Sequence, residues 1–380
     1  MELKGNLGDD TFKSLNQILE RQLDVNYDLG ASMALAVDGE IVLDVWGGWA
    51  DEEHTAPWEA DTITNVWSTT KTMTAISALL LMERGSLDPD ATVASYWPEF
   101  AQNGKQDILV RHILSHTSGV SAWAQPVTTE AILDDEGATA RLAAQAPWWE
   151  PGTAFGYHAL NQGHLVGEVI KRIDGRGLKQ FFAEDVAGPL DADFTIGSPP
   201  ENHHRISNVT PPPPLPLPPD LDPESVTFKT FNGPQPEAEI AHTASWRAAT
   251  IGAANGHGNA RSVAKIQAVI SNGGFSHGVQ LLSPETIDRI FVAQPHGVDQ
   301  VLMMPVRFGL GYDLAAATNS VGITSGKKCY WGGWGGSLVL NDLDNRITLT
   351  YMMNRMQAGF VGNETSIALI AGLNKIVGSS

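Results

Sequence analysis

A ten-residue run without a charged side chain, residues 73–82 (MTAISALLLM), constrains this chain more than any other segment. Its length favours a helix over a strand, and a helix that is apolar on every side must be buried on every side. Ser68-Thr-Thr-Lys71 stands directly before the run. Residues three apart share one helix face, so this segment predicts a serine beside a lysine at the start of a buried helix. Loss of hydration lowers the pKa of such a lysine, which then acts as a base toward the serine hydroxyl.

The Ser-x-x-Lys spacing occurs three times in the chain. Ser262 and Lys265 stand in ARSVAKIQAVIS, whose apolar residues form one stripe and predict a surface helix with a solvated lysine. Ser325 and Lys328 stand in a polar glycine turn, where the lysine is expected to be solvated and cationic. Only the first pair opens a segment that is apolar enough to bury its lysine. The sequence therefore favours Ser68 as a nucleophile and Lys71 as its base.

Composition limits the remaining possibilities. A chain of 380 residues with 42% apolar and 18% charged residues predicts a folded protein of two subdomains. The net charge of −19 argues against nucleic acid and anionic membrane surfaces as partners. No apolar run reaches the roughly 18 residues of a membrane span, and the N-terminus shows no secretory signal. The single cysteine, Cys329, excludes an internal disulfide. We therefore expect a cytoplasmic protein.

Strand patterns stand at both ends of the chain around a helical middle. A helix is predicted over 10–23, and two apolar runs joined by Asp38-Gly39 predict a β-hairpin. The other predicted elements are helices near 129–145, near 160–173 and from about 261, and strands near 300–314, 335–341 and 346–353. This order predicts a sheet domain over 1–67 and 250–380 and a mainly helical domain over 68–249. The proline-rich segment 211–219 is expected to be a stiff covering loop.

Two further segments carry residues suited to the same chemistry. Tyr157 follows a Pro-Gly turn at a predicted loop-to-helix junction, and a phenol near a lysine ammonium is easier to deprotonate and can pass protons. A half-buried structural tyrosine is the alternative. Residues 331–337 (WGGWGGS) place four glycines beside two tryptophans before a strand. Glycines let a backbone approach a ligand closely, and free N–H groups there can stabilise an oxyanion; a turn packed by tryptophans is the alternative.

Together, Ser68-x-x-Lys71, Tyr157 and the later Trp-Gly-Gly resemble the serine β-lactamase/penicillin-binding-protein superfamily. Within it, the chain is most similar to class C β-lactamase-like carboxylesterases, the family VIII esterases. The resemblance implies an α+β fold in which an antiparallel sheet flanked by helices is set against a mostly helical domain. It also implies that Ser68 is acylated, that Lys71 is its base, and that Tyr157 exchanges protons with the nucleophile and the leaving group. The backbone N–H groups of Ser68 and Trp334 would form the oxyanion hole.

Two departures from the superfamily pattern bear on the substrate. Lactamases and peptidases usually have Tyr-x-Asn where this chain has Ala159, and a lysine where it has Trp331. Loss of that cation and that amide removes two anchors for an anionic β-lactam. We therefore expect cleavage of carboxylic esters of small, largely apolar molecules, without cofactor or metal. The expected substrate-binding residues are aromatic or glycine residues beside the motifs, namely Trp67, Trp123, Trp149, Trp331, Gly332 and Gly333.

Several alternatives remain open. An acyltransferase on the same scaffold would use identical residues, and a β-lactamase, a peptidase or a non-catalytic binder is less favoured. Gly274-x-Ser276-x-Gly278 matches a nucleophile elbow, but it follows a predicted helix, so a plain glycine turn is the better interpretation. His203-His204 lacks the spacing of a metal site. His116 and His158 are expected to be structural, and the sequence leaves the oligomeric state open.

Overall fold

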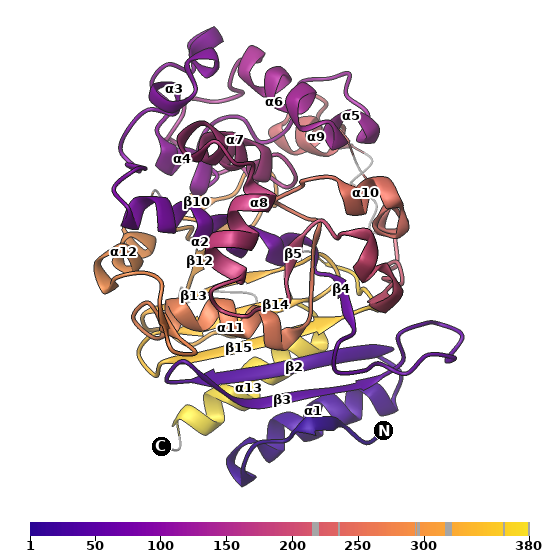
Figure 1. Cartoon of the computed structure of the whole chain (residues 1–380). Helices are drawn as coiled ribbons and strands as arrows, with labels where there is room; N and C mark the ends of the chain where they lie inside the picture. Colours follow the sequence, from indigo (N-terminus) through magenta and orange to yellow (C-terminus); the bar gives the residue numbers. More distant parts are fainter. Residues whose placement is uncertain are drawn as a thin grey trace.

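A seven-stranded antiparallel sheet forms the base of the molecule in this computed structural model (Figure 1). The structure describes residues 1–214, 220–234, 236–292, 294, 297–315, 321–359 and 362–378. Helices α1 (Lys13–Asp24) and α13 (Glu364–Gly378) cover one face of the sheet, and α11 (Ala260–Ser271) covers the other (Figure 1). In spatial order the strands are β1 (Lys4–Asn6), β3 (Glu40–Gly48), β2 (Gly30–Val37), β15 (Ile347–Met353), β14 (Leu338–Asp342), β13 (Lys328–Gly332) and β12 (Asp313–Leu314). The predicted α+β fold is confirmed.

The two ends of the chain meet in the middle of this sheet. The predicted hairpin is confirmed as β2 and β3, which turn through Asp38 (φ 53°) and Gly39 (φ 83°). Two successive residues with positive φ match the twist that the flanking strands require. Strand β2 then pairs with β15 along its whole length, from Val37 opposite Ile347 to Ala31 opposite Met353. The predicted strands near 335–341 and 346–353 are confirmed as β14 and β15.

The helical part of the chain stands on the other side of α11. The helices predicted near 129–145 and 160–173 are confirmed as α5 (Thr129–Leu133), α6 (Asp135–Ala144) and α7 (Gln162–Asp174). The remaining helices here are α3 (Val93–Tyr96), α4 (Val110–Leu114), α8 (Leu178–Phe182), α9 (Val226–Phe231) and α10 (Ala244–Ala248). A small sheet of order β5-β7-β4-β6 joins this part to the base; its strands are Thr195–Ile196, Gly256–Gly258, Ile63–Asn65 and Ile206–Ser207. The exact division into two domains stays a prediction.

Helix α2 (Thr70–Glu83) contains the apolar run and passes through the centre of the molecule. Every residue from Thr70 to Met82 is buried. The helix packs against α7, α8 and α12 (Pro284–Asp288), so no face of it reaches water. The prediction that this helix is buried on all sides is confirmed.

Three local predictions are wrong. The helix expected on the surface from about residue 261 is α11, which lies between the sheet and the helical part with ten of its twelve residues buried. The strand predicted near 300–314 is reduced to β11 (Pro305–Val306) and β12, because Pro305 cannot donate to a strand ladder and Gly311 adopts φ +80°. Lys328 is not solvated: it begins β13, is 6% exposed, and forms an ion pair with Asp342 at 2.9 Å. Strands β12 and β14 pair on both sides of β13, so its first residue is covered.

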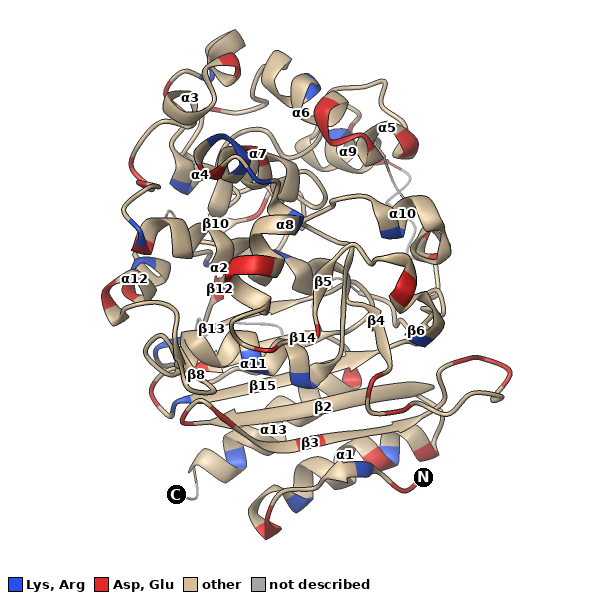
Figure 2. Ribbon diagram, viewed as in Figure 1, with Lys and Arg blue, Asp and Glu red and all other residues tan. Residues whose placement is uncertain are grey.

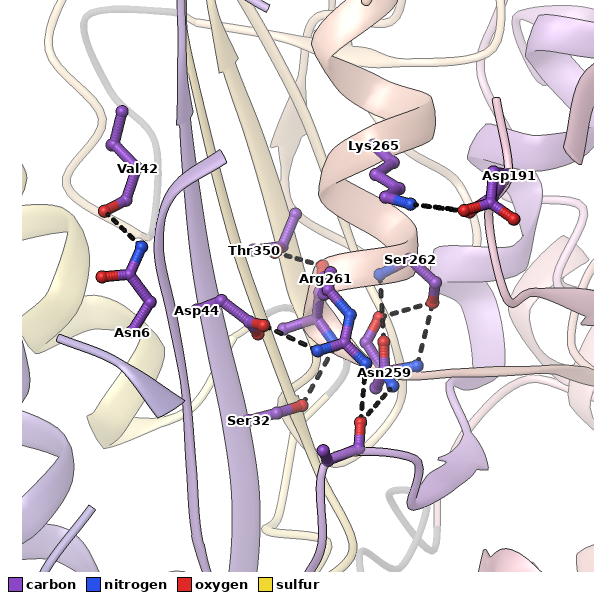
Figure 3. Close-up of polar contacts among 12 residues, drawn as sticks. Asn6, Ser32, Val42, Asp44, Asp191, Asn259, Arg261, Ser262, Lys265 and Thr350 are labelled. Atoms are coloured by element: carbon purple, nitrogen blue, oxygen red, sulfur yellow. Dashed lines mark hydrogen bonds and ion pairs between the residues drawn. The ribbon is translucent and has the colours of Figure 1, made fainter. Parts of the chain in front are cut away.

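The second Ser-x-x-Lys pair has a structural role at the start of α11 (Figure 3). Asn259 and Ser262 form a capping box, in which each side chain binds the backbone N–H of the other at 3.0 Å. Lys265 reaches Asp191, with Nζ at 3.3 Å from a carboxylate oxygen. The two side chains of the pair are therefore engaged with different partners.

Loss of this cap should destabilise the protein. We expect Ser262→Ala to lower the free energy of unfolding by about 0.5–2 kcal/mol, because the buried backbone N–H of Asn259 loses the Ser262 hydroxyl that accepts its hydrogen bond. Urea unfolding followed by circular dichroism measures the change. Ser325→Ala, in an exposed turn, is the matched control and should change stability by less than about 0.5 kcal/mol. Equal effects of the two substitutions would contradict a capping role.

Candidate active site

Ser68 lies where the chain passes from strand β4 into helix α2. A single turn of 3-10 helix, η2 (Trp67–Thr69), makes this connection, and Trp67 adopts φ +49° within it. A left-handed tryptophan is sterically costly, and such strain persists only where neighbouring contacts hold it. The Thr70 hydroxyl supplies one contact by donating to the carbonyl of Trp67 at 2.5 Å and accepting from the N–H of Gly256 at 2.8 Å. The turn therefore presents Ser68 in one fixed position.

Lys71 is buried next to this serine, with 0% exposure. Its Nζ lies 3.0 Å from Ser68 Oγ, 2.7 Å from the carbonyl oxygen of Ala159 and 3.0 Å from that of Ala253. No carboxylate in the described part of the chain forms an ion pair with it. Burial alone lowers its pKa well below the ordinary lysine value. A neutral amine has two N–H bonds and one lone pair, so the two carbonyls take the N–H bonds and the lone pair is left for Ser68.

The phenol of Tyr157 contacts the same serine from the segment that precedes α7. Its oxygen lies 2.8 Å from Ser68 Oγ. Burial raises the pKa of Tyr157 above its usual value, while hydrogen bonds to the side chains of Ser68 and Trp331 partly offset this effect. The expectation that a nearby ammonium eases deprotonation of the phenol is therefore wrong, because Lys71 favours its neutral form. The phenol is a proton donor at rest.

Two buried histidines support Tyr157 from behind. His158 holds both ring nitrogens in hydrogen bonds of 2.6 Å, to the Ser118 hydroxyl and to the carbonyl of Gly156. Burial lowers the pKa of His158 to about 3, so its ring is neutral. His116 accepts from the N–H of His158 at 3.1 Å, and its ring stacks on Trp331 at 5.4 Å. This arrangement matches the structural role expected for both.

A glycine-rich turn after β13 closes the site against Ser68. Ser337 Oγ lies 2.9 Å from the carbonyl oxygen of Val66 and 3.0 Å from Thr69 Oγ1. The ring of Trp334 packs edge-on against Trp67 at 5.0 Å. Among the described residues, no hydrogen bond uses the backbone N–H of Ser68 or of Trp334. Two unused N–H groups on adjoining segments are what an oxyanion hole requires.

A cavity of about 460 Å³ opens over Ser68 and Tyr157. Aromatic, aliphatic and proline side chains make up most of its wall, and its charged residues are Glu237 and Glu239. The wall includes Trp67, Trp123, Ala159, Leu160, Phe231 and Trp334, together with six prolines, Pro211, Pro212, Pro213, Pro214, Pro234 and Pro236. Ser68 therefore faces a largely apolar cavity that is large enough for a small molecule.

A model of the family described as Beta-lactamase matches residues 15–372. The chain belongs to this family. Esterase/beta-lactamase LipL of Mycobacterium tuberculosis is 32% identical over 358 residues, which cover 88% of this chain and 80% of that protein. The crystal structure of a family VIII carboxylesterase superposes with a TM-score of 0.93 at 34% identity, over 99% of this chain and 100% of that one. A penicillin-binding protein homologue from Caulobacter crescentus has a TM-score of 0.91 at 31% identity, over the same shares.

The predicted substrate-binding residues of this beta-lactamase family member divide into two groups. Trp67 and Trp123 line the cavity, whereas Trp149, Trp331, Gly332 and Gly333 are not part of its wall. Trp149 instead donates to the carbonyl of Ala154 at 3.0 Å, and Trp331 packs against the rings of both His116 and Tyr157. Both indoles face the supporting layer behind Tyr157, which explains why they do not reach the chamber.

Other residues of the site carried no signal in the sequence. Asp299 is buried, and one of its oxygens accepts from the N–H of Tyr157 at 3.1 Å, fixing that residue from 142 positions away. The carbonyls of Ala159 and Ala253 are backbone groups, so residue type does not reveal them. The proline-rich pattern of 211–214 indicates only a covering loop, not a contact with the cavity; residues 215–219 of that segment lie outside the described residues.

Other reactive chemistry finds little support among the described residues. No group of three or more histidine, cysteine or acidic side chains is arranged there to hold a metal ion. Ser276 lies in the short hairpin of β8 (Phe275–Ser276) and β9 (Val279–Gln280), not in a strand-to-helix elbow. Burial raises the pKa of Cys329 to about 12, which leaves it a thiol. None of the helices in the described ranges is long and apolar enough to cross a membrane.

Gly333 lets the glycine-rich turn after β13 approach the segment that leads into Ser68. A Cβ atom there would lie 2.3 Å from the carbonyl oxygen of Val66 and 2.2 Å from Ser337 Oγ. We expect Gly333→Ala to push the turn away and reduce kcat at least about 100-fold, the typical loss for one oxyanion donor. Steady-state kinetics on an activated ester measures this. Gly177→Ala is the control, since its Cβ meets nothing within 4 Å and its φ is −66°. An unchanged kcat in Gly333→Ala would show that the turn does not stabilise the oxyanion.

Proposed function

We propose that this protein is a serine hydrolase that cleaves carboxylic esters of small, largely apolar molecules through an acyl-Ser68 intermediate. One observation carries the proposal: Ser68 Oγ lies between a buried lysine amine at 3.0 Å and a tyrosine phenol at 2.8 Å. Lysine in this state is a base and the phenol is an acid, which are the two proton-transfer partners that acyl transfer needs. The relatives named as an esterase and as a carboxylesterase support the same reaction.

Acylation begins with the lone pair of Lys71. It takes the proton of Ser68 as Oγ attacks the ester carbonyl carbon, and the oxyanion forms against the N–H groups of Ser68 and Trp334. Tyr157 gives its proton to the leaving alkoxide, so the alcohol departs neutral. Acylation ends with an acylated serine, a protonated Lys71 and a tyrosinate, whose opposite charges offset one another in the buried site.

Deacylation runs in the reverse order. Tyr157 regains its proton from a water molecule, and the hydroxide adds to the acyl carbon. The second tetrahedral intermediate collapses, Ser68 Oγ leaves, and it recovers its proton from Lys71. The carboxylic acid is released and both catalytic groups return to their starting protonation states.

The wall of the cavity supports neutral, apolar substrates. Tryptophan, proline and aliphatic side chains dominate it, and apolar walls favour apolar acyl groups. Ala159, at the position where lactamases usually have an asparagine, lines the cavity without an amide. Trp331, at the position of their lysine, carries no charge and forms a hydrogen bond with Tyr157. The charged wall residues, Glu237 and Glu239, disfavour anions. These features argue against efficient turnover of penicillins or peptide carboxylates.

Acyl transfer to an alcohol is the second candidate. A cavity of about 460 Å³ has room for an acyl group and an acceptor together. The catalytic residues would be the same, and the outcome depends on whether water or an alcohol reaches the acyl-serine. Adding alcohols to an ester assay and measuring the ratio of transfer product to free acid decides between the two.

A cytoplasmic location accompanies this proposal. The only cysteine is a buried thiol, which is compatible with a reducing compartment. Detection of the tagged protein in cell fractions tests the location directly.

Removal of the nucleophile should abolish both labelling and turnover. We expect wild-type protein to form one fluorophosphonate adduct on Ser68, and Ser68→Ala to form none and lose at least about 1,000-fold in kcat. Intact-protein mass spectrometry and an aryl ester assay measure these outcomes. Ser262→Ala is the control, because that serine belongs to an unrelated Ser-x-x-Lys pair, and it should keep the adduct. An unlabelled wild-type protein would favour a non-catalytic binder.

The pH dependence follows from the pKa shifts of the two partners. Activity requires neutral Lys71, whose pKa is lowered by burial, so kcat rises with pH only through that lowered value. Tyr157 must keep its proton, and burial raises its pKa, so no fall in kcat is expected at the ordinary tyrosine value of about 10. A profile of kcat for a neutral ester should therefore be flat through neutral and mildly alkaline pH. A rise in kcat centred at a pH of about 10 would show that Lys71 is cationic at rest.

A further inference from the structure

The glycine-rich turn of residues 333–337 is supported from behind by the side chain of Asn363. A Cβ atom on Gly336 would lie 2.2 Å from Asn363 Nδ2, so the backbone of the turn rests directly on this amide. The same nitrogen donates to the carbonyl oxygen of Gly335 at 3.5 Å. Asn363 is 5% exposed. So close an approach is possible because Gly336, at φ +130°, has no side chain.

Asn363 is itself fixed by helix α13, which begins at the next residue. Its Oδ1 accepts from the N–H of Ser366 at 2.9 Å, and Ser366 Oγ accepts from the N–H of Asn363 at 2.7 Å. Helix α13 has charged residues only at Glu364 and Lys375, and it lies on the face of the sheet away from α2 (Figure 2). Because Oδ1 is used by the helix, Nδ2 is the part of the amide that is directed at the turn.

Tyr351 gives this amide a second acceptor. Its phenol oxygen lies 3.5 Å from Asn363 Nδ2 and 2.6 Å from Asp28 Oδ1. Asp28 is 1% exposed, and its other oxygen accepts from the Thr365 hydroxyl at 2.9 Å. Burial raises the pKa of Asp28 to about 6, so above neutral pH it is a carboxylate, which can only accept. The phenol therefore donates to Asp28, and its lone pairs are left for Asn363 Nδ2.

Strand pairing brings these hydrogen bonds to the base of the turn. Tyr351 stands opposite Leu338 in the pairing of β15 with β14, and Leu338 directly follows the turn. On the side toward Ser68, the Ser337 hydroxyl donates to the carbonyl of Val66 at 2.9 Å. The turn is therefore held between the segment before Ser68 on one side and the start of α13 on the other.

A turn of this composition needs such contacts if it is to stabilise an oxyanion. Gly335 and Gly336 directly follow Trp334, and glycine has more backbone freedom than any other residue. A hydrogen-bond donor is effective only when it is in place before the charge develops. Without support, the two glycines would let the N–H of Trp334 take many directions. Asn363 removes this freedom, because it blocks Gly336 and binds the carbonyl of Gly335.

We propose that Asn363 is a positioning residue for the oxyanion hole and that Tyr351 and Asp28 act through it. None of the three belongs to the wall of the cavity over Ser68, so they act on the reaction through the turn alone. Asn363 keeps the N–H of Trp334 directed at the oxyanion in both acylation and deacylation. This inference rests on the proposed ester hydrolysis, which uses that N–H group.

Replacement of the amide tests this role. Serine caps helices about as well as asparagine, so Asn363→Ser keeps the bond to the N–H of Ser366 and loses the contacts with the turn. We expect kcat for a neutral aryl ester to fall about tenfold while KM changes less than about twofold, because the donor is needed only when the oxyanion forms. Steady-state kinetics, with Tm recorded for each variant, measures both. An unchanged kcat in folded Asn363→Ser protein would overturn the proposal.

A second substitution tests whether Tyr351 acts through Asn363. Tyr351→Phe removes only the hydroxyl, and we expect it to lower kcat about threefold, the effect of one lost hydrogen bond. The double variant should be no slower than Asn363→Ser alone, because the route from Tyr351 to the turn is then already broken. Losses that multiply in the double variant would show that Tyr351 acts independently and would overturn its part of the proposal.

Ser366→Ala is the matched control. It removes a hydroxyl from the same helix start but leaves Asn363 Nδ2 with both of its acceptors. Tm should fall, and kcat should stay within about twofold of the wild-type value. A loss of kcat equal to that of Asn363→Ser would show that Asn363 is only a helix cap. Failure of the hydrolase proposal looks different, since wild-type protein would then turn over no ester and form no adduct on Ser68, and both proposals would fall.

Discussion

Desolvation of Lys71 is the constraint on which the site depends. A lysine side chain in water is an ammonium, which has no lone pair to accept a proton. A neighbouring carboxylate would keep the ammonium charged in the interior as well. Here the side chain enters the interior with two backbone carbonyls and one hydroxyl as its polar contacts. The carbonyls stabilise the amine without neutralising a charge, so burial lowers the pKa of the lysine without opposition. The same low-polarity surroundings raise the pKa of Tyr157 and so separate a base from an acid on either side of one serine.

This constraint explains why so much of the molecule is built around α2. A helix that carries a buried amine must be covered on every face, and α7, α8 and α12 provide that cover. The two carbonyls that hold Lys71 come from the segments before α7 and after α10, at Ala159 and Ala253. The turn after β13 comes from the C-terminal part of the sheet, which the pairing of β2 with β15 joins to the N-terminal hairpin. Segments far apart in the chain therefore meet at Ser68.

Much of the site could be predicted from residues because its chemistry requires particular side chains. A serine, a lysine and an apolar run in succession already indicate a buried base, and the glycines around Trp334 indicate close backbone approach. The predictions failed where neighbours decided the outcome. Lys328 stands in a polar stretch, yet two flanking strands bury it and Asp342 neutralises it. Trp331 and Trp149 stand beside the motifs, yet both pack behind Tyr157 instead of lining the cavity.

The sequence by itself determined the buried helix, the hairpin through Asp38-Gly39 and the choice of Ser68 among three similar pairs. These are local properties, since periodicity, turn residues and the absence of charge act over a few positions. Only the tertiary structure decided that Tyr157 keeps its proton, that Asp299 anchors it and that no described residue accepts from the amides of Ser68 and Trp334. The physical reason is that pKa values and free hydrogen-bond donors depend on which atoms surround a group. Those atoms come from parts of the chain that only folding brings together.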